Sequence, residues 1–335
     1  MDVSRPGVRM THRGYFLRVP ERGVHVLTSY ITQDPELFLL AHMGLAAVDP
    51  LEWNLEVGGM IMKPASFRLA DLQAMPQYEV TSVHECAGSP LTPSVPKRRV
   101  GNVVWSGVRL ADVLEQCCLA PGAAFVWTHA LEWGDFADLK NESYVKDLPL
   151  AKATSPEVLL ATGMNGLPLT PDRGAPVRLV VPGWYGTNSV KWLGALTVTD
   201  CRASGPYTTR FYNDPSPGGP KPVWAIAPES VIVSPSPGAA PSAGEPSLIQ
   251  GWAWAESGVE RVEVTCDAGE TWLPAELEPR VGFGWQRFSL PWTFQPGPCR
   301  LSCRSFDASG NGQPESGARN ALHEVVIDVP ANVHA

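Results

Sequence analysis

The sequence predicts a two-domain protein of class α+β, in which a mixed first domain is followed by a β-sandwich of roughly a hundred residues. Its 335 residues exceed the length at which a single core stops growing. The 33 prolines and 31 glycines indicate many short strands and loops, and they argue against a helical bundle. Helical patterns occur only early in the chain, and we therefore place the two domains at residues 1–205 and 206–335.

The first domain is expected to contain both helices and strands. Its predicted elements are an entry segment at 1–45 that lies against the domain, a strand–turn–strand at 53–61, a short helix at 67–72 and a strand at 78–83. A second helix is predicted at 110–119, where apolar residues 110, 113, 114 and 117 share one helical face. Cys117 is therefore expected in the core.

The second domain shows strand patterns without helical ones. The tract of prolines and small residues at 234–241 is too broken for a core element, and is either a connector or a long loop opening this domain. Residues 259–264 alternate between apolar and charged side chains with the period of a half-buried strand. Strands are predicted at 248–254, 259–264, 284–288, 299–304 and 325–329. Short strands separated by turn residues predict a β-sandwich.

Composition limits the possible partners. A hydrophobic share of 44% predicts a packed interior, and a formal net charge of −8 argues against nonspecific nucleic-acid binding. No apolar run approaches the length of a membrane span, and residues 1–6 carry neither a signal-peptide pattern nor a twin-arginine signal. We therefore expect a cytoplasmic protein with no membrane and no nucleic-acid partner.

The seven cysteines do not indicate a disulfide framework, because their number is odd and their spacing irregular. They form neither CxxC nor CxxCH. Cys299 and Cys303 lie four residues apart and would share one face of a strand. A zinc site there would need two further ligands, and no histidine pair lies nearby in the sequence.

Two short motifs about a hundred residues apart carry the functional argument. Residues 83–88 (Val-His-Glu-Cys-Ala-Gly) bring a strand directly into Cys86, and Gly88 permits a sharp turn that would expose the thiolate. Residues 181–193 (Val-Pro-Gly-Trp-Tyr-Gly-Thr-Asn-Ser-Val-Lys-Trp-Leu) combine a Pro-Gly turn with a lysine. Each motif alone has a plain explanation, because a lone cysteine is usually a buried apolar residue and Pro-Gly usually precedes a strand.

In this order, the two motifs resemble the molybdenum-cofactor domain of the sulfite oxidase family. Residues 161–169 and 174–179 also match the family, and the similarity runs from about residue 35 to about residue 330. The second domain resembles the family's immunoglobulin-like dimerisation domain through residues 251–254, 262–272 and 304–314. The resemblance thus implies a molybdopterin-binding domain followed by an Ig-like β-sandwich, and a homodimer.

The resemblance also implies which residues hold a molybdenum–molybdopterin cofactor. Cys86 would supply a soft thiolate ligand to the metal. Coordination would deprotonate its thiol group. The remaining cofactor-binding residues are expected to be His42, Arg173, Arg178, Asn188, Ser189 and Lys191. Lys191 and Arg178 would bind the phosphate end of the pterin. Lys191 could instead be a solvated lysine, whereas a charge inside the apolar strand around Arg178 normally has a partner.

The sequence departs from the family around the substrate pocket. Sulfite oxidases usually read Cys-Ala-Gly-Asn-Arg-Arg, but here Cys86-Ala87-Gly88 is followed by Ser-Pro-Leu. Leu40 stands where the family has an arginine, and Thr162 stands at the position taken for its active-site tyrosine, so Thr162 is the second catalytic candidate. Arg173 replaces a family histidine. Residues 97–99 (Lys-Arg-Arg) could restore positive charge, although a solvated basic face is the usual fate of such a run. Arg287 is a further cation that could reach the pocket.

The function implied by the resemblance is a molybdenum-dependent oxidoreductase that transfers an oxygen atom to a small sulfur-containing substrate, sulfite or a less charged variant. Electrons would leave to a separate acceptor or to oxygen, because the chain contains no CxxCH haem motif. One alternative is a reductase of a sulfoxide or N-oxide on the same fold. The other is a non-catalytic dimeric binding or scaffold protein, which the altered pocket favours and the retained Cys86 opposes.

Overall fold

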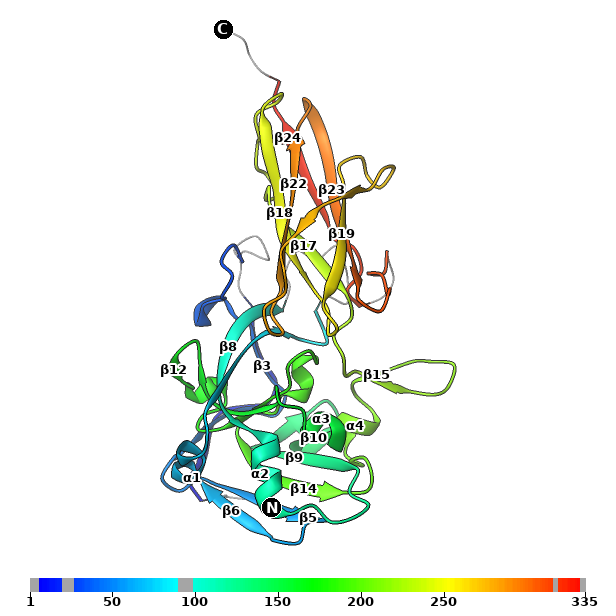
Figure 1. Cartoon of the computed structure of the whole chain (residues 1–335). Coiled ribbons are helices and arrows are strands. Elements are labelled where there is room, and N and C mark those ends of the chain that lie inside the picture. The colour runs from blue at the N-terminus through cyan, green and yellow to red at the C-terminus, as the bar shows by residue number, and fades with distance from the viewer. Residues whose placement is uncertain (1–5, 20–26, 90–98, 316–318, 332–335) are drawn as a thin grey trace. The chain divides into compact units, whose positions relative to one another are not determined.

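The computed structural model describes residues 6–19, 27–89, 99–315 and 319–331, and these residues form two compact units (Figure 1). Of them, residues up to 18, 38–80 and 103–224 belong to the first unit. The second unit takes the others, including 27–37, the turn around Cys86, and everything after 224. This division differs from the predicted boundary at residue 205, because two early segments contact the later part of the chain.

Hydrogen bonds within the second unit explain why residues 27–37 do not lie with the first one, as the entry segment was expected to do. The indole nitrogen of Trp285 donates to the carbonyl oxygen of Tyr30 at 2.9 Å. The backbone nitrogen of Thr32 donates to the carbonyl oxygen of Asn102 at 2.8 Å. Buried polar groups need such partners. The entry segment is therefore shared between the units.

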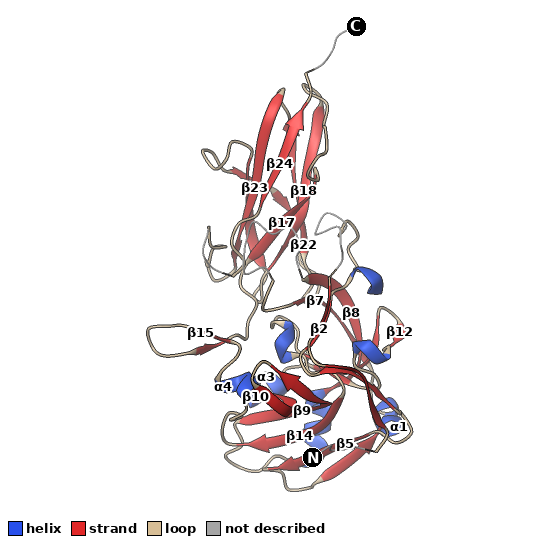
Figure 2. Ribbon diagram, turned by 180° about the vertical axis from the view of Figure 1, so that it is seen from behind, coloured by secondary structure: helices blue, strands red, loops and turns tan. Residues whose placement is uncertain are grey.

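Strands dominate the structure, and the helices are short (Figure 2). The helices are α1 (Leu69–Ala74), α2 (Leu110–Cys117), α3 (Leu150–Ala153) and α4 (Pro206–Thr209), with 3₁₀ turns η2 (Asp34–Glu36), η3 (Pro171–Arg173) and η4 (Gly186–Asn188). The predicted second helix is confirmed as α2, and Cys117 is buried as expected. The predicted helix at 67–72 begins two residues later, because Arg68 is extended and its backbone nitrogen bonds to the carboxylate of Asp71. No helix among the described residues is long and apolar enough to cross a membrane.

Two sheets contribute to the first unit, and residues 81–85 and 100–102 of the second sheet belong to the other unit. One has the order β10 (Leu139–Pro149), β9 (Phe125–Phe136), β14 (Leu193–Thr199), β5 (Asn54–Gly59) and β6 (Ala65–Arg68). Strands β14 and β5 are parallel, with Ala195 opposite Glu56, and the other pairs are antiparallel. The second sheet contains β12 (Leu167–Pro168), β11 (Leu159–Met164), β8 (Val100–Arg109) and β7 (Tyr78–Glu85), with β13 (Arg178–Val180) paired to β11.

Short strand pairs complete the first unit. They are β1 (Val8–Arg13) with β4 (Gly44–Val48), β2 (Phe16–Arg18) with β3 (Leu39–Ala41), and β15 (Asn213–Asp214) with β16 (Lys221–Pro222). One hydrophobic core joins the long strands to α2, and its fully buried members include Leu55, Leu114 and Leu196. Its buried members Leu179 of β13 and Leu193 of β14 lie close in sequence to Arg178 and Lys191, two of the predicted cofactor residues.

A buried ion pair ties β10 to the loop after β14. Asp147 is fully buried, and its carboxylate accepts hydrogen bonds from Nε and Nη2 of Arg202 at 2.9 and 3.1 Å. It also accepts one from the backbone nitrogen of Ala203 at 3.1 Å. Removing one partner of such a pair leaves the other without compensation for its lost hydration.

We expect Asp147→Ala to lower the free energy of unfolding by about 3 kcal/mol, the lower end for a broken buried pair. The lower end applies because the Arg202 side chain keeps 31% of its surface exposed. Urea denaturation measures the loss. Asp138→Ala is the matched control, because Asp138 pairs with Arg210 on the surface, and it should leave the midpoint unchanged. Equal midpoints for both variants would contradict the assignment.

The second unit contains two four-stranded sheets. The first has the order β17 (Glu229–Ser234), β18 (Pro246–Trp254), β22 (Gln286–Thr293) and β21 (Glu276–Leu277). The second has the order β20 (Leu273–Pro274), β19 (Val259–Thr265), β23 (Gly297–Asp307) and β24 (Glu324–Val329). In Figure 1, β17, β18 and β22 run side by side, as their pairing requires. Both sheets contribute to one core, for example through Phe288 and Leu301. The proline-rich tract follows β17 and leads into β18. It is therefore a long loop at the start of the second domain and not a connector between domains.

Candidate functional site

In the first unit, the cations predicted to bind the cofactor gather around the entry strand β3. Nη1 of Arg173 donates to the carbonyl oxygen of Phe38 at 2.6 Å, and Nζ of Lys191 donates to that of Leu40 at 2.7 Å. Nη1 of Arg178 donates to the carbonyl oxygen of Arg173 at 3.1 Å. Segments far apart in sequence therefore place three positive charges in one cluster.

Local backbone geometry allows Lys191 to reach this cluster. Gly174 follows η3 with φ of +100°, a conformation that favours glycine. A Cβ on Gly174 would lie 2.8 Å from Cβ of Lys191, closer than side chains can approach. The neighbouring Trp192 also holds this segment against η3, since its indole nitrogen donates to the carbonyl oxygen of Pro171 at 2.7 Å. Glycine at 174 is thus required for Lys191 to pack against the end of η3.

Arg178 is a buried cation whose hydrogen-bonding capacity is not filled by the part of the chain that the structure describes. It is 3% exposed, its Nη2 donates to the carbonyl oxygen of Ser189 at 3.2 Å, and its guanidinium lies 4.7 Å from the centroid of the Trp105 ring. Its Nε is buried and has no hydrogen-bond partner among the described residues. Burial, together with the positive charge of Arg173, lowers the pKa of Arg178 to about 9. An anion bound beside Arg178 would accept the hydrogen bond of its Nε and compensate its buried positive charge.

A buried carboxyl group accompanies the cations. Glu132 of β9 is 3% exposed, and burial raises its pKa, while the positive charge of Lys191 opposes that rise. Burial lowers the pKa of Lys191, and the carboxyl group of Glu132 opposes that change. The partly buried carboxyl group of Asp172 also acts on Lys191, so three cations face two carboxyl groups and positive charge predominates in the cluster. It is therefore suited to an anionic group.

His42 lies in the turn between β3 and β4 and is enclosed by aromatic rings. Its ring stacks on Tyr144 with 5.3 Å between centroids and contacts Phe136 edge-on at 4.9 Å. Nε2 of His42 is hydrogen-bonded to the hydroxyl group of Tyr212. Burial and the charge of Lys191 lower the pKa of His42 to about 3, so the imidazole is neutral at physiological pH. Neutral imidazole can accept or donate one hydrogen bond at each nitrogen as its tautomer dictates.

The low pKa of His42 predicts acid sensitivity. Between pH 6.5 and 3, His42 binds a proton in the unfolded chain but not in the folded protein. The free energy of unfolding therefore falls as pH falls, by about 1.4 kcal/mol per pH unit. We expect His42→Gln to remove this part of the loss between pH 6.5 and 5, measured by urea denaturation. His12→Gln, on exposed β1, should retain it. An identical pH dependence of His42→Gln and the unsubstituted protein would contradict the assignment.

Tyr212 was missed by the sequence analysis. It has φ of +60°, which is uncommon outside glycine and is often associated with functional sites. The run of aromatic residues between 207 and 212 was the available signal, but only the fold brings it to His42. Thr162, the predicted catalytic candidate, lies on β11, where its carbonyl oxygen accepts from Leu169, and no described contact joins its side chain to the cluster.

The neutral residues of the second motif shape its backbone. Oγ of Ser189 accepts a hydrogen bond from the backbone nitrogen of Val181 at 3.1 Å. Nδ2 of Asn188 donates to the carbonyl oxygens of Tyr185 and Val223, both at 3.0 Å. These bonds hold η4 and the residues before Lys191 in place. A cofactor-binding role for either side chain remains a prediction.

Cys86 belongs to the second unit, directly after β7. Its side chain is 8% exposed, its backbone nitrogen donates to the carbonyl oxygen of Arg99 at 2.9 Å, and its carbonyl oxygen accepts from Ser89 at 2.9 Å. The backbone nitrogen of Gly88 lies 3.4 Å from Sγ of Cys86 and donates to it. A tight turn therefore presents the sulfur with an N–H donor. The sequence predicted a sharp turn that exposes the thiolate, whereas the Cys86 side chain is buried in the structure. Lys97 and Arg98 lie outside the described residues.

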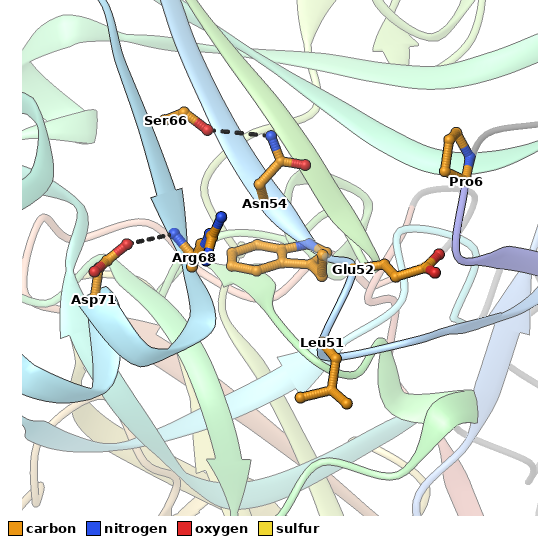
Figure 3. A pocket seen from close by; sticks show the side chains of 8 residues that line it. Pro6, Leu51, Glu52, Asn54, Ser66, Arg68 and Asp71 are labelled. Atoms are coloured by element: carbon orange, nitrogen blue, oxygen red, sulfur yellow. Dashed lines mark hydrogen bonds between the residues drawn. The ribbon is translucent and has the colours of Figure 1, made fainter.

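A separate cavity of about 630 Å³ lies in the first unit and is drawn in Figure 3. Trp53, Asn54 and Arg68 are among its lining residues. Two hydrogen bonds brace its wall, from Nδ2 of Asn54 to Oγ of Ser66 at 3.1 Å and from the Arg68 backbone to Asp71 at 2.7 Å. None of the predicted site residues lines this cavity, so it is distinct from the candidate site.

Comparison with known proteins identifies the family. A sequence model of the oxidoreductase molybdopterin binding domain matches residues 42–207, and one of the Mo-co oxidoreductase dimerisation domain matches residues 221–327. Sulfite oxidase of Arabidopsis thaliana is 30% identical over 352 residues that cover 93% of this chain and 89% of that protein. The chain belongs to the sulfite oxidase family. The molybdenum cofactor, molybdopterin, is therefore the group that its matched first domain binds.

Two further relatives extend the comparison. Mitochondrial sulfite oxidase of Mus musculus is 32% identical over 369 residues, covering 98% of this chain. The chain spans 66% of the length of that relative. The crystal structure of the sulfane dehydrogenase SoxCD from Paracoccus pantotrophus is similar with a TM-score of 0.80 and 26% identity, covering 91% of this chain and 85% of that one. The fold of this sulfite oxidase family member is thus shared across nearly its whole length.

The residues present fit the molybdenum cofactor. The pterin ends in a phosphate, which requires fixed cations, and the structure supplies Arg173, Arg178 and Lys191 with an unsatisfied buried donor on Arg178. The resemblance implies a cysteine thiolate as the protein ligand of molybdenum, and Cys86 is a free cysteine on a turn that donates a backbone N–H to its sulfur. The first unit thus holds cations suited to a phosphate, and the second unit holds a thiol suited to a metal.

Proposed function

We propose that this protein is a molybdenum-dependent oxidoreductase that transfers an oxygen atom to a small sulfur-containing substrate. The observation that carries the proposal is the retained pair of donor sets, the thiolate turn at Cys86 and the buried cluster of Arg173, Arg178 and Lys191. A chain that had become a non-catalytic scaffold would not need to keep a costly buried excess of positive charge. When bound, the cofactor supplies the two-electron oxygen-transfer chemistry.

The protein's contribution is to bind and orient the cofactor and substrate. Cys86 would ligate the metal, and Arg178 and Lys191 would hold the phosphate end of the pterin through charge-assisted hydrogen bonds. The neutral imidazole of His42 would offer the cofactor a hydrogen bond without adding charge. Fixed donors of this kind cost no reorganisation during the reaction.

We assign the role of the family's active-site tyrosine, as a donor of a hydroxyl hydrogen bond, to Tyr212 and not to Thr162. The Tyr212 hydroxyl group already bonds to Nε2 of His42, which the resemblance places at the cofactor. Its strained backbone indicates that the surrounding structure holds it there. Tyr212 can therefore orient a substrate oxygen with its hydroxyl group while His42 stays neutral.

The second unit is proposed to act as an Ig-like β-sandwich that forms a homodimer. Support comes from its two four-stranded sheets around one core and from the match to the dimerisation domain. The proposed enzyme passes its electrons to a separate acceptor. Light scattering at several protein concentrations tests the dimer, which should persist at micromolar chain concentrations.

Steady-state assays with an artificial one-electron acceptor test the proposed activity. Sulfite and neutral organic sulfides would be offered as reductants, and sulfoxides and N-oxides as oxidants with a reduced dye. We expect oxidation of a sulfur compound by protein that contains molybdenum. Turnover confined to sulfoxide or N-oxide reduction would support the reverse reaction instead, and no turnover in either direction by molybdenum-loaded protein would contradict the proposal.

A further inference from the structure

A lysine of the first unit is completely buried against the Tyr212 ring. Lys146 of β10 is 0% exposed, and its Nζ donates a hydrogen bond to the carbonyl oxygen of Tyr207 at 2.9 Å. The same Nζ lies 5.6 Å from the centroid of the Tyr212 ring, within the range of a cation–π contact. Fully buried lysines are rare, because an ammonium group loses its hydration on burial. The buried charge of Lys146 therefore calls for a functional explanation.

The carboxylate next to Lys146 in the chain is directed elsewhere. Successive strand residues point to opposite faces, and the carboxylate of Asp147 is hydrogen-bonded to Arg202. Burial lowers the pKa of Lys146 to about 8, while the charge of Asp147 raises it and that of Arg202 lowers it. The ammonium group therefore keeps its charge at neutral pH, where it contacts a carbonyl oxygen and an aromatic ring.

The segment that Lys146 holds belongs to the candidate site. Tyr207 of α4 is fully buried, and its ring contacts that of His42 with 5.3 Å between centroids. Farther along the same segment, the carbonyl oxygen of Tyr212 accepts from the backbone nitrogen of Val223 at 2.9 Å, and the Tyr212 hydroxyl group is hydrogen-bonded to His42. The hydrogen bond from Lys146 thus anchors the start of a segment whose end carries Tyr212.

The ammonium group also acts on the Tyr212 phenol through its charge. A nearby cation favours negative charge that develops on the phenol oxygen, which makes the hydroxyl group a stronger hydrogen-bond donor. The His42 imidazole is neutral at physiological pH, so it can accept that hydrogen bond at Nε2 when its proton is on Nδ1. Lys146 is therefore placed to influence both the position and the donor strength of the Tyr212 hydroxyl group.

We propose that Lys146 is a positioning residue that holds the Tyr212 hydroxyl group on His42 and strengthens it as a hydrogen-bond donor. This inference rests on the proposed function, in which Tyr212 orients a substrate oxygen. The sequence analysis did not single out Lys146, because the usual place of a lysine is the solvated surface. An apolar residue in its place would often stabilise the fold, and the positioning role explains why the chain carries a buried charge there.

Nitrogen NMR of His42 tests the positioning role without any turnover. Full-length protein with isotope-labelled histidine would be produced without the cofactor, and His42→Gln would identify the signals of His42. Tyr212→Phe removes the hydroxyl group and gives the Nε2 signal that lacks this hydrogen bond. We expect Lys146→Met to move the Nε2 signal at least half of the way from its position in the unsubstituted protein to its position in Tyr212→Phe.

Lys140→Met is the matched control, because Lys140 is an exposed lysine of the same strand that pairs with Asp135. It should leave the His42 signals unchanged. Circular dichroism checks that each variant is folded. Lys146→Gln, which is also uncharged, takes the place of Lys146→Met if the methionine variant does not fold, with the same expected shift. A folded variant that lacks the Lys146 charge and keeps the unsubstituted Nε2 signal would overturn the positioning role.

Kinetics of the molybdenum-loaded enzyme separate this inference from the proposed function. Lys146→Met should lower kcat about tenfold with a smaller change in KM, because a misplaced donor weakens contacts made in the transition state more than it weakens binding. Lys140→Met should retain both constants. If the unsubstituted enzyme oxidises no sulfur compound, the proposed function fails, and the His42 signal still decides the role of Lys146. If it oxidises one and Lys146→Met retains its kcat, the positioning role is wrong.

Discussion

Replacing Cys86 by serine should abolish turnover and remove or weaken the bound molybdenum. Serine offers an alcohol oxygen that is not deprotonated as readily as a thiol, so it replaces the thiolate ligand poorly. Loss of a group that merely supports a metal ligand costs 10- to 100-fold, and we expect the loss of the ligand itself to exceed about a hundredfold in kcat. Metal analysis and steady-state kinetics on the same preparation measure both effects.

Cys201→Ser is the matched control for this prediction. Cys201 is an exposed free cysteine, so the substitution changes the same atoms without touching the turn after β7. It should retain molybdenum and activity. Full turnover of Cys86→Ser with unchanged metal content would contradict the assignment of Cys86 as the metal ligand.

Replacing Arg178 by methionine should release the cofactor while leaving the fold intact. Methionine keeps much of the apolar stem in the buried site but removes a cation whose Nε has no partner among the described residues. We expect the affinity of the protein for the cofactor to fall by about 10- to 100-fold, because the variant loses a charge-assisted hydrogen-bond partner. Pterin content after gel filtration measures the loss, and circular dichroism checks the fold.

Arg109→Met separates this effect from a general loss of arginine. Arg109 also lies in the first unit and also has a buried Nε without a partner among the described residues, but its guanidinium stacks on Tyr78 at 3.7 Å. It should retain the cofactor. Equal pterin content in the two variants would show that Arg178 does not hold the anionic end.

The sequence could predict elements whose signal is local. The apolar spacing at 110, 113, 114 and 117 predicted α2, and the alternation at 261–264 predicted β19, because each pattern reports one buried face. A register shift between Val259 and Arg261 interrupts the alternation before that point. The turn after residue 83 followed from Cys86 and Gly88 in the same way. The family resemblance then supplied His42, Arg178 and Lys191.

The remaining features depend on contacts between distant residues. Residues 27–37 belong to the second unit because Tyr30 accepts a hydrogen bond from Trp285, and nothing near Tyr30 in the sequence signals that partner. The hydrogen bond of Tyr212 to His42 spans 170 positions, and that of Arg319 to Ala87 spans 232. Side chains of this kind acquire their roles only when the fold is formed, so a local pattern alone could not identify their partners.

The molybdenum and pterin content of the purified full-length protein, from a host that makes the cofactor, tests the central claim most directly. Elemental analysis and fluorescence of the oxidised pterin would be measured on the same sample. The proposed function predicts about one molybdenum and one pterin per chain, as one thiolate turn and one cation cluster require. A folded protein that carries neither group would contradict the enzyme assignment and favour a binding role for this fold.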